Sequence, residues 1–301
     1  MRAVVFDRFG PPEVLRLADL PDPQPGPGEV RVRVRAAGVQ PFDVAVRAGQ
    51  MTHLPVSFPQ QIGQEYAGVV DQVGVGVTGL SPGDEVLGSA MLNAVAEYVV
   101  VAAENVVRKP AELDFPTAAG FVAAGQTATG ALNELRIAAG ETLLVHAAAG
   151  SVGTIAVQVA KRAGLTVVGT AGPANHDYLR ELGAIPVAYG DGLAERVRTA
   201  APHGVDVALD AAGRGAIAAS VELIEDRKRI GTIVDDEGAR EHGVHVVRAA
   251  RSPQRLADVI ALAARGEIGM PIRAYPWEDV VAAHRTVESG HGRGKVVLVL
   301  P

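Results

Sequence analysis

The chain has 301 residues, of which 48% are hydrophobic, and a net charge of −6 carried by interspersed acidic and basic residues. This length is sufficient for two domains, and the charge pattern indicates no nucleic-acid or anionic-membrane surface. Cysteine is absent, which excludes disulfides and thiolate-ligated zinc; with no long apolar span and no evident signal peptide, we expect a cytoplasmic protein without a membrane partner.

The sequence up to residue 115 has the patterns of β-strands. Val30, Val32 and Val34 alternate with arginines, which is the period of two expected for a strand with one face in water. The preceding segment, 21–29, is rich in proline and glycine and is interpreted as a loop. We expect further strands at 67–73, 85–87 and 96–101, and a short helix at 44–48 with Asp43 as its N-terminal cap.

From residue 116 the pattern changes to helix and then to alternating strands and helices. The expected strands are 142–145, 166–169, 185–188, 205–210, 229–234 and 244–247, and the expected helices are 151–162, 175–182, 193–201, 216–223 and 253–265. This alternation predicts an α/β fold with a doubly wound parallel sheet that has helices on both faces. A last helix at 277–288 and a last strand at 295–300 are expected to return to the N-terminal β domain.

The segment 142–153, TLLVHAAAGSVG, predicts a strand that runs through a glycine turn into a helix. Ala148, Gly150 and Gly153 take the three positions of the G-x-G-x-x-G pattern, with alanine in the first. Such a turn directs the free N–H groups of the helix start, here at Ser151 and Val152, toward a pyrophosphate. The pattern therefore predicts a dinucleotide site, and the alternative is a tight turn that binds nothing.

The end of the next strand indicates which dinucleotide is bound. Residues 170–172 contain no carboxylate to bind a ribose 2′-OH, and such a carboxylate would repel a 2′-phosphate. The sequence therefore favours NADPH over NADH. The candidate donors to the 2′-phosphate are Thr170, Asn175, His176 and Tyr189, although Asn175 could instead cap a helix and Tyr189 could be a packed ring.

Several ordered motifs carry a resemblance to a known family: GEVRVRVRAAGVQPFDVAVRAG, GQEYAGVVDQVGVGV, PGDEV, AEYVVV, AAAGSVG and GRGKVVLVL. Over essentially its whole length the chain resembles the medium-chain dehydrogenase/reductases, specifically the zinc-free, NADPH-dependent, quinone oxidoreductase-like branch. The resemblance implies a GroES-like β domain at 1–122 and 267–301 and a Rossmann NADPH-binding domain at 123–266. We also expect a homo-oligomer, specifically a dimer.

Zinc-dependent members of this superfamily place a cysteine and a histidine where this chain has Gln40 and Gln64. Neutral amides are poor zinc ligands, and Glu65 alone cannot hold the ion. The sequence therefore predicts no metal site, and the histidines, including His146 and His284, show no ligand-like spacing.

The resemblance places Gln40 and Thr127 near the nicotinamide and the acceptor, as the candidate catalytic residues. Without a metal, a quinone or an α,β-unsaturated carbonyl compound is the favoured substrate, and the Gln40 amide is a candidate donor to the developing oxyanion; the alternative is that it only orders its loop. Many relatives have a tyrosine where this chain has Ala45, and Tyr66, the nearest phenol by motif, is interpreted as core. A tailoring enoyl or ketone reductase, and a catalytically silent NADPH-binding structural or regulatory protein, therefore remain open as alternatives.

Overall fold

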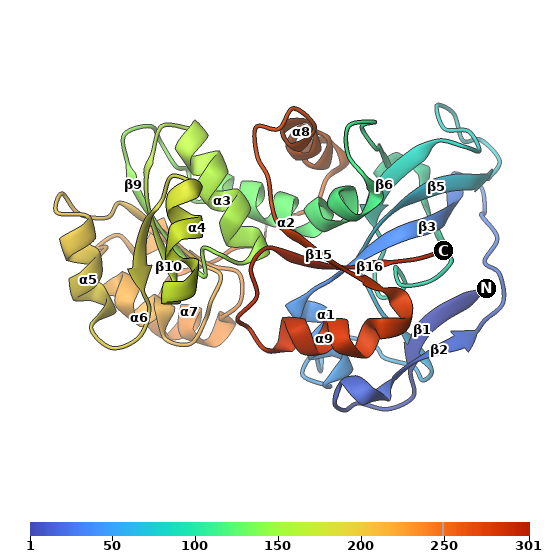
Figure 1. Ribbon diagram of the computed structural model, residues 1–301, viewed down its shortest axis with the longest axis horizontal. Helices are drawn as coiled ribbons and strands as arrows, with labels where there is room; N and C mark the ends of the chain where they lie inside the picture. Colours follow the sequence, from blue (N-terminus) through green and yellow to red (C-terminus); the bar gives the residue numbers. More distant parts are fainter. Residues whose placement is uncertain (249) are drawn as a thin grey trace. The chain divides into compact units, whose positions relative to one another are not determined.

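The computed structural model describes residues 1–248 and 250–301, and its contacts divide the chain into two compact units (Figure 1). The first unit comprises Met1–Ala123, Ser252–Glu267 and Pro271–Pro301, and the second comprises Ala124–Arg251 and Ile268–Met270. The segment Ser252–Glu267, expected in the nucleotide-binding domain, belongs by contacts to the first unit, because its helix α8 (Pro253–Ala264) packs beside β8 (Val107–Arg108). Among the described residues, no helix is long and apolar enough to cross a membrane.

The first unit is built on a seven-stranded sheet in the order β15-β16-β3-β5-β6-β8, with β7 also paired to β3. Besides β8, the strands are β15 (Ile272–Pro276), β16 (Lys295–Val299), β3 (Glu29–Val39), β5 (Glu65–Val73), β6 (Glu85–Ser89) and β7 (Tyr98–Ala102). Antiparallel pairing of β16 with β3 joins the C-terminal strand to this sheet, as predicted. The alternating valines of β3 are buried in the core, which explains why this strand is central.

A smaller sheet and two helices complete the first unit. The sheet pairs β2 (Leu15–Asp19), β1 (Arg2–Phe6) and β4 (Gln60–Gln61). Helix α1 (Pro41–Arg47) lies beside α9 (Val280–Glu288), and Arg47 Nη2 donates to Glu288 Oε1 at 2.8 Å. His284 of α9 is buried, and this burial together with the Arg47 charge lowers its pKa to about 3, so its ring is neutral and structural.

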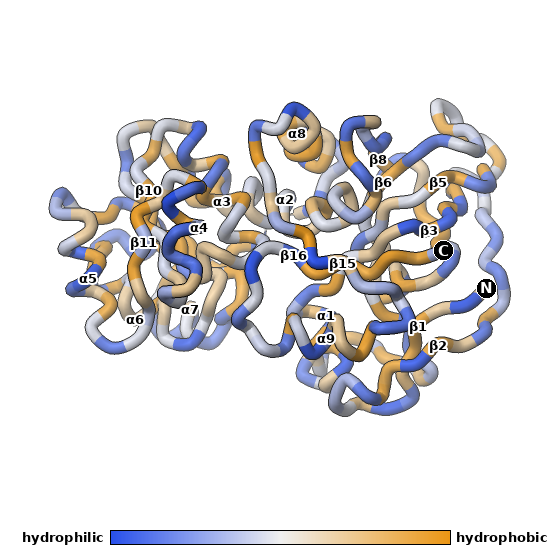
Figure 2. Tube along the Cα trace, viewed as in Figure 1, coloured by the Kyte–Doolittle hydropathy of each residue, from blue (hydrophilic) through white to orange (hydrophobic). Residues whose placement is uncertain are grey.

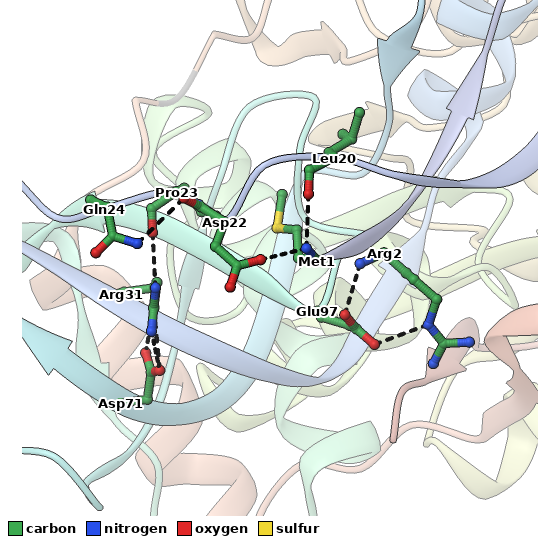
Figure 3. A network of polar contacts seen from close by, with 9 residues as sticks. All are labelled: Met1, Arg2, Leu20, Asp22, Pro23, Gln24, Arg31, Asp71 and Glu97. Atoms are coloured by element: carbon green, nitrogen blue, oxygen red, sulfur yellow. Dashed lines mark hydrogen bonds and ion pairs between the residues drawn. The ribbon is translucent and has the colours of Figure 1, made fainter.

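A network of polar contacts fixes the proline-rich loop of the first unit (Figure 3). Arg31 differs from the expectation of a water-facing arginine: it is buried, and it donates to both carboxylate oxygens of Asp71, at 2.9 and 2.7 Å, and to Pro23 O at 3.1 Å. The Met1 amino group donates to Leu20 O at 2.8 Å and pairs with Asp22. These contacts tie the loop to strand β3.

The second unit contains a parallel six-stranded sheet in the order β11-β10-β9-β12-β13-β14. The strands are β9 (Thr142–His146), β10 (Thr166–Ala171), β11 (Ile185–Ala188), β12 (Val207–Asp210), β13 (Ile230–Thr232) and β14 (His245–Val246). Numbered along the chain, this order is 3-2-1-4-5-6, the Rossmann arrangement, whose ligand crevice lies where the order reverses, between β9 and β12. Figure 2 shows apolar strands between more hydrophilic loops, as expected for a sheet buried on both faces.

The helices of the second unit follow the predicted alternation. They are α3 (Ser151–Arg162), α4 (His176–Glu181), α5 (Leu193–Ala200), α6 (Ala216–Val221) and α7 (Asp236–His242), and α2 (Phe115–Glu134) leads into this unit from the first. The predicted elements do not include helix α7 and strand β15. Helix α1 begins at Pro41, with Gln40 at the N-cap position, so the prediction that Asp43 occupies the N-cap is wrong.

Candidate functional site

The turn between β9 and α3 is shaped by two glycines and a strained alanine. A Cβ on Gly153 would lie 2.4 Å from Ala147 O and 2.6 Å from Ala148 Cα, so only glycine lets the helix approach the strand end this closely. Ala147 itself adopts a left-handed conformation with φ of 54°. Gly153 therefore has a structural role in the turn.

Alanine at the first position of the glycine pattern is accommodated by the neighbouring strand. Ala148 is fully buried, and a Cβ on Gly169 of β10 would lie 2.8 Å from the Ala148 Cβ. The methyl group of Ala148 thus fills space that a side chain at 169 would otherwise need. The departure from the G-x-G-x-x-G pattern consequently leaves the turn intact.

Gly150 faces an open side of the same turn. The nearest atom to a Cβ built on it, and the one within 4 Å, is Ala147 O at 3.3 Å. Gly150 is the N-cap residue of α3, followed by half-buried Ser151 and Val152, and the first N–H groups of a helix have no partner within the helix. An open backbone next to free N–H groups is the chemistry that a pyrophosphate requires.

The predicted donors to the 2′-phosphate differ in their exposure to solvent. The Thr170 hydroxyl is buried and lies 3.4 Å from His146 Nδ1, so it is directed into the protein and is removed as a phosphate donor. Tyr189 is 56% exposed, which contradicts the alternative of a packed ring. A Cβ on Gly172 would lie 3.7 Å from the Tyr189 hydroxyl, so this phenol reaches the end of β10.

Asn175 and His176 lie at the same end of β10. Asn175 precedes α4 but makes no side-chain cap hydrogen bond, so the alternative of a helix cap is not observed. His176 is half-buried, with Nε2 at 3.3 Å from Ala171 O. The nearest carboxylate along the chain, Asp177, is exposed and pairs with Arg180 at 2.5 Å.

Arg196 of α5 was not predicted, yet it holds the loop that presents Tyr189. Its guanidinium donates to Ala188 O at 3.0 Å, Gly190 O at 3.0 Å and Asp191 O at 2.6 Å. Three backbone carbonyls fixed by one side chain restrict this loop. A lone arginine on a helix gives no sequence signal for such contacts.

Polar side chains lie buried at the ends of β9, β10 and β12. His146 Nε2 lies 2.9 Å from the Ser220 hydroxyl, and burial lowers the His146 pKa to about 4 against the opposing effect of Asp210. Asp210 accepts hydrogen bonds from the backbone N–H groups of Ala212 and Gly213, both at 2.8 Å. His146 is therefore an uncharged structural residue near neutral pH.

In the first unit, the side-chain amide of Gln40 takes part in the capping box of α1 and has one unpartnered atom, its nitrogen. Its Nε2 atom is buried and has no hydrogen-bond partner among the described residues. Its backbone N–H donates to Asp43 Oδ2 at 2.9 Å, so Asp43 braces the N-cap from inside the helix. A buried N–H donor that lacks an acceptor costs free energy unless a ligand or water supplies one.

Glu65, which follows the Gln64 of the zinc motif, is committed to other partners. It is fully buried, its Oε1 lies 2.5 Å from Lys295 Nζ, and its Oε2 accepts from the backbone N–H of Ala123 at 2.6 Å. Within the described part of the chain, no group of three or more His, Cys, Asp or Glu residues could hold a metal ion. Two amides and an ion-paired carboxylate do not fit a zinc ion.

The remaining candidate catalytic residues lie in different units or in the core. Thr127 is half-buried on α2 and belongs to the second unit, whereas Gln40 belongs to the first. Tyr66 is fully buried against Gly88, and its burial raises the pKa of its hydroxyl, so it is a core residue and no proton donor. Ala45 supplies no polar group.

Two family models match the chain: the alcohol dehydrogenase GroES-like domain over residues 26–129 and the zinc-binding dehydrogenase family over residues 182–298. Human quinone oxidoreductase is 32% identical over an alignment 326 positions long, which covers 100% of this chain and 98% of that protein. NorB of the spectinabilin polyketide synthase system of Streptomyces orinoci is 34% identical over 289 residues, which cover 88% of this chain and 13% of NorB. Escherichia coli quinone oxidoreductase complexed with NADPH has a TM-score of 0.90 and 27% identity over 100% of both chains.

Proposed function

Because the chain belongs to the medium-chain dehydrogenase/reductase superfamily, in its zinc-free quinone oxidoreductase-like branch, we propose that it transfers a hydride from NADPH to a conjugated acceptor. The acceptor is a quinone or an α,β-unsaturated carbonyl compound. The observation that carries this proposal is the buried, unpartnered Nε2 of Gln40, in a unit whose residues do not fit a zinc ion.

The second unit would hold the cofactor. The open backbone at Gly150 and the helix start at Ser151 and Val152 suit the pyrophosphate, and the tight contacts of Gly153 and Ala148 keep that turn in shape. Asn175, His176 and Tyr189 would receive the 2′-phosphate, and the lack of a carboxylate in residues 170–172 avoids repelling it. When bound, NADPH supplies a hydride to a carbon atom of the acceptor.

Gln40 would act on the acceptor oxygen. Addition of a hydride to the carbon end of a conjugated system moves negative charge to the oxygen at the other end. A fixed N–H donor at that oxygen stabilises the charge as it develops, because the donor needs little reorganisation. A conjugated acceptor spreads this charge further than an isolated ketone does, and therefore depends less on a Lewis acid.

A tailoring enoyl reductase is the second candidate, favoured by two observations. The chain matches 13% of NorB, a protein of a polyketide synthase system, and it has Ala45 where many quinone reductases have tyrosine. Its substrate would be an enoyl thioester, which is also a conjugated carbonyl compound. Both candidates use the same donor at Gln40.

Oxidation of NADPH, measured with a panel of quinones, enones, enoyl thioesters and ketones, tests the proposal. We expect turnover with conjugated acceptors and little with isolated ketones. Tight NADPH binding without turnover on any acceptor would favour the catalytically silent alternative. We further propose that the protein is a cytoplasmic homodimer, which light scattering of the purified protein and fractionation of cells would test.

A further inference from the structure

Three ionisable side chains lie buried in the first unit, close to Gln40, and come from distant parts of the sequence. Asp43 of α1 is 1% exposed, Glu65 of β5 is fully buried, and Lys295 of β16 is 4% exposed. The ammonium group of Lys295 lies 2.5 Å from Glu65 Oε1. This site thus contains its own positive charge, supplied by the chain.

We propose that Lys295 is the fixed cation of this site and that, together with Glu65 and Asp43, it positions the Gln40 amide for the acceptor oxygen. The inference rests on the proposed function of Gln40. Lys295 and Asp43 act through Gln40 and are positioning residues, since neither is argued to touch the substrate.

The packing around Lys295 and Glu65 is built for this ion pair. A Cβ on Gly38 of β3 would lie 1.9 Å from Glu65 Oε1, so the absence of a side chain at Gly38 makes room for the carboxylate. A Cβ on Gly120 of α2 would lie 2.8 Å from Ile272 Cδ1 and 3.3 Å from Lys295 Cγ, so Gly120 leaves space for both side chains. With Glu65 Oε2 held by Ala123 N–H, the pair has one defined geometry.

Asp43 links the Lys295–Glu65 ion pair to Gln40, because its carboxyl responds to both charges and accepts the hydrogen bond of the Gln40 backbone N–H. Burial raises the pKa of the Asp43 carboxyl to about 7; the backbone N–H groups of Gln40 and Gly63 and the Lys295 ammonium lower it, and Glu65 raises it. Its Oδ2 is the acceptor for the Gln40 N–H, and its Oδ1 is buried without a partner among the described residues. The charge on Asp43 therefore sets the strength of the hydrogen bond that fixes the N-cap.

A buried ion pair is weak evidence for stability alone, because its desolvation offsets much of its attraction. What distinguishes this pair is the direction in which each member acts on Asp43. Removal of Lys295 should favour protonated Asp43, and neutralisation of Glu65 should favour ionised Asp43. A pair whose charges did not act on Asp43 would show no such opposition at Gln40.

The Gln40 backbone N–H resonance, observed in ¹⁵N-glutamine-labelled protein and identified by its loss in Gln40→Ala, reports this coupling directly. In the natural protein it should titrate with a midpoint near the Asp43 pKa, and Asp43→Asn should abolish that titration. We expect Glu65→Gln to lower the midpoint and Lys295→Met to raise it, each by about one pH unit, while Lys295→Arg stays close to the natural value. Lys109→Met, at a buried lysine paired with Glu85 at 2.9 Å, is the matched control and should leave the midpoint unchanged.

The rate of acceptor reduction gives the second readout. Lys295→Met should lower kcat by about 10- to 100-fold with an unchanged Kd for NADPH, and Lys295→Arg should recover most of that rate. Equal midpoints in Glu65→Gln and the natural protein, or equal losses of kcat in Lys295→Met and Lys109→Met, would overturn the inference. If no acceptor is reduced at all, the proposed function fails, and the Gln40 titration still decides whether the three charges act on Gln40. Should Lys295→Met not fold, Glu65→Gln and Lys295→Arg carry the same test.

Discussion

The two units offer polar groups of opposite kinds. In the second unit the cofactor turn presents backbone N–H groups above buried side chains such as His146, whose pKa of about 4 leaves it uncharged near neutral pH. In the first unit the Gln40 backbone N–H donates to Asp43, whose carboxyl has its pKa raised to about 7 by burial, and the buried ion pair of Glu65 and Lys295 acts on that carboxyl. We therefore expect binding of the pyrophosphate to depend on backbone shape, and acceptor reduction to depend on buried charge.

The largest effect is expected from adding a side chain at Gly150, the glycine with open space in the cofactor turn. Gly150→Val should weaken NADPH binding by about 100-fold or more, roughly 2.7 kcal/mol, because the branched side chain occupies the space for the pyrophosphate. Fluorescence titration of NADPH, together with a thermal unfolding curve, measures the effect. We expect the fold to survive, because the new Cβ meets one atom within 4 Å, Ala147 O at 3.3 Å, and this contact needs a shift of a few tenths of an ångström.

Gly153→Ala is the matched control for that variant. Its Cβ would lie 2.4 Å from Ala147 O, so we expect a lower melting temperature as well as weaker binding. Unchanged NADPH affinity in a folded Gly150→Val protein would mean that the turn is only structural.

The acceptor site should respond to a different change. Gln40→Ala removes the unpartnered donor and should lower kcat by about 10- to 1000-fold while the Kd for NADPH stays nearly constant. Thr127→Ala, on the second unit, should instead raise the apparent KM for NADPH. Steady-state kinetics on the best acceptor separates the two. A Gln40→Ala enzyme with full kcat would leave orientation of donor and acceptor as the main source of rate.

The two sites also differ in how far the sequence predicts them. The cofactor turn is local: strand, glycines and helix follow one another within residues 142–162, so their order predicts their geometry. The bracing of Gln40 joins residues 43, 65 and 295, and neither Lys295 nor Gly38 has a neighbour in sequence that indicates its partner. The outward-facing interpretation of Arg31 was wrong for the same reason, since Asp71 lies 40 residues away. Thr170 was assigned to the phosphate from its position alone, which does not show which way its hydroxyl points.

The preference for NADPH over NADH is expected to be a smaller effect than the loss of NADPH binding in Gly150→Val. NADPH should bind at least about tenfold more tightly than NADH, roughly 1.4 kcal/mol. Ala171 is buried, so an aspartate there would bury a carboxylate, and Gly172, whose Cβ would have open space up to Tyr189, is the better site. Gly172→Asp should shift the preference toward NADH by repelling the 2′-phosphate. Gly172→Asn, of similar size without charge, should keep the NADPH preference; equal shifts in both variants would assign the effect to size.

A last expected effect, a shift of a few degrees in melting temperature, concerns stability and pH, and it isolates the buried charge of the first unit. Burial raises the Asp43 pKa from 3.8 to about 7, so between these values the folded protein holds a proton that the unfolded chain releases. The stability that this proton contributes is present below about pH 3.8 and is lost as the pH rises through 7. Asp43→Asn has no such loss.

The difference in melting temperature between Asp43→Asn and the natural protein should therefore shift in favour of the variant by a few degrees between pH 5 and pH 8.5, about 2–3 kcal/mol at most. Asp84→Asn is the control: Arg108 lowers the pKa of the Asp84 carboxyl, which titrates below this range, so its difference from the natural protein should stay constant. A constant difference for Asp43→Asn as well would show that Asp43 keeps one charge state across this range. The dependence of acceptor reduction on charge would then come from Glu65 and Lys295 alone. The Gln40 N–H would no longer be expected to respond to pH, and this difference between the two units would not exist.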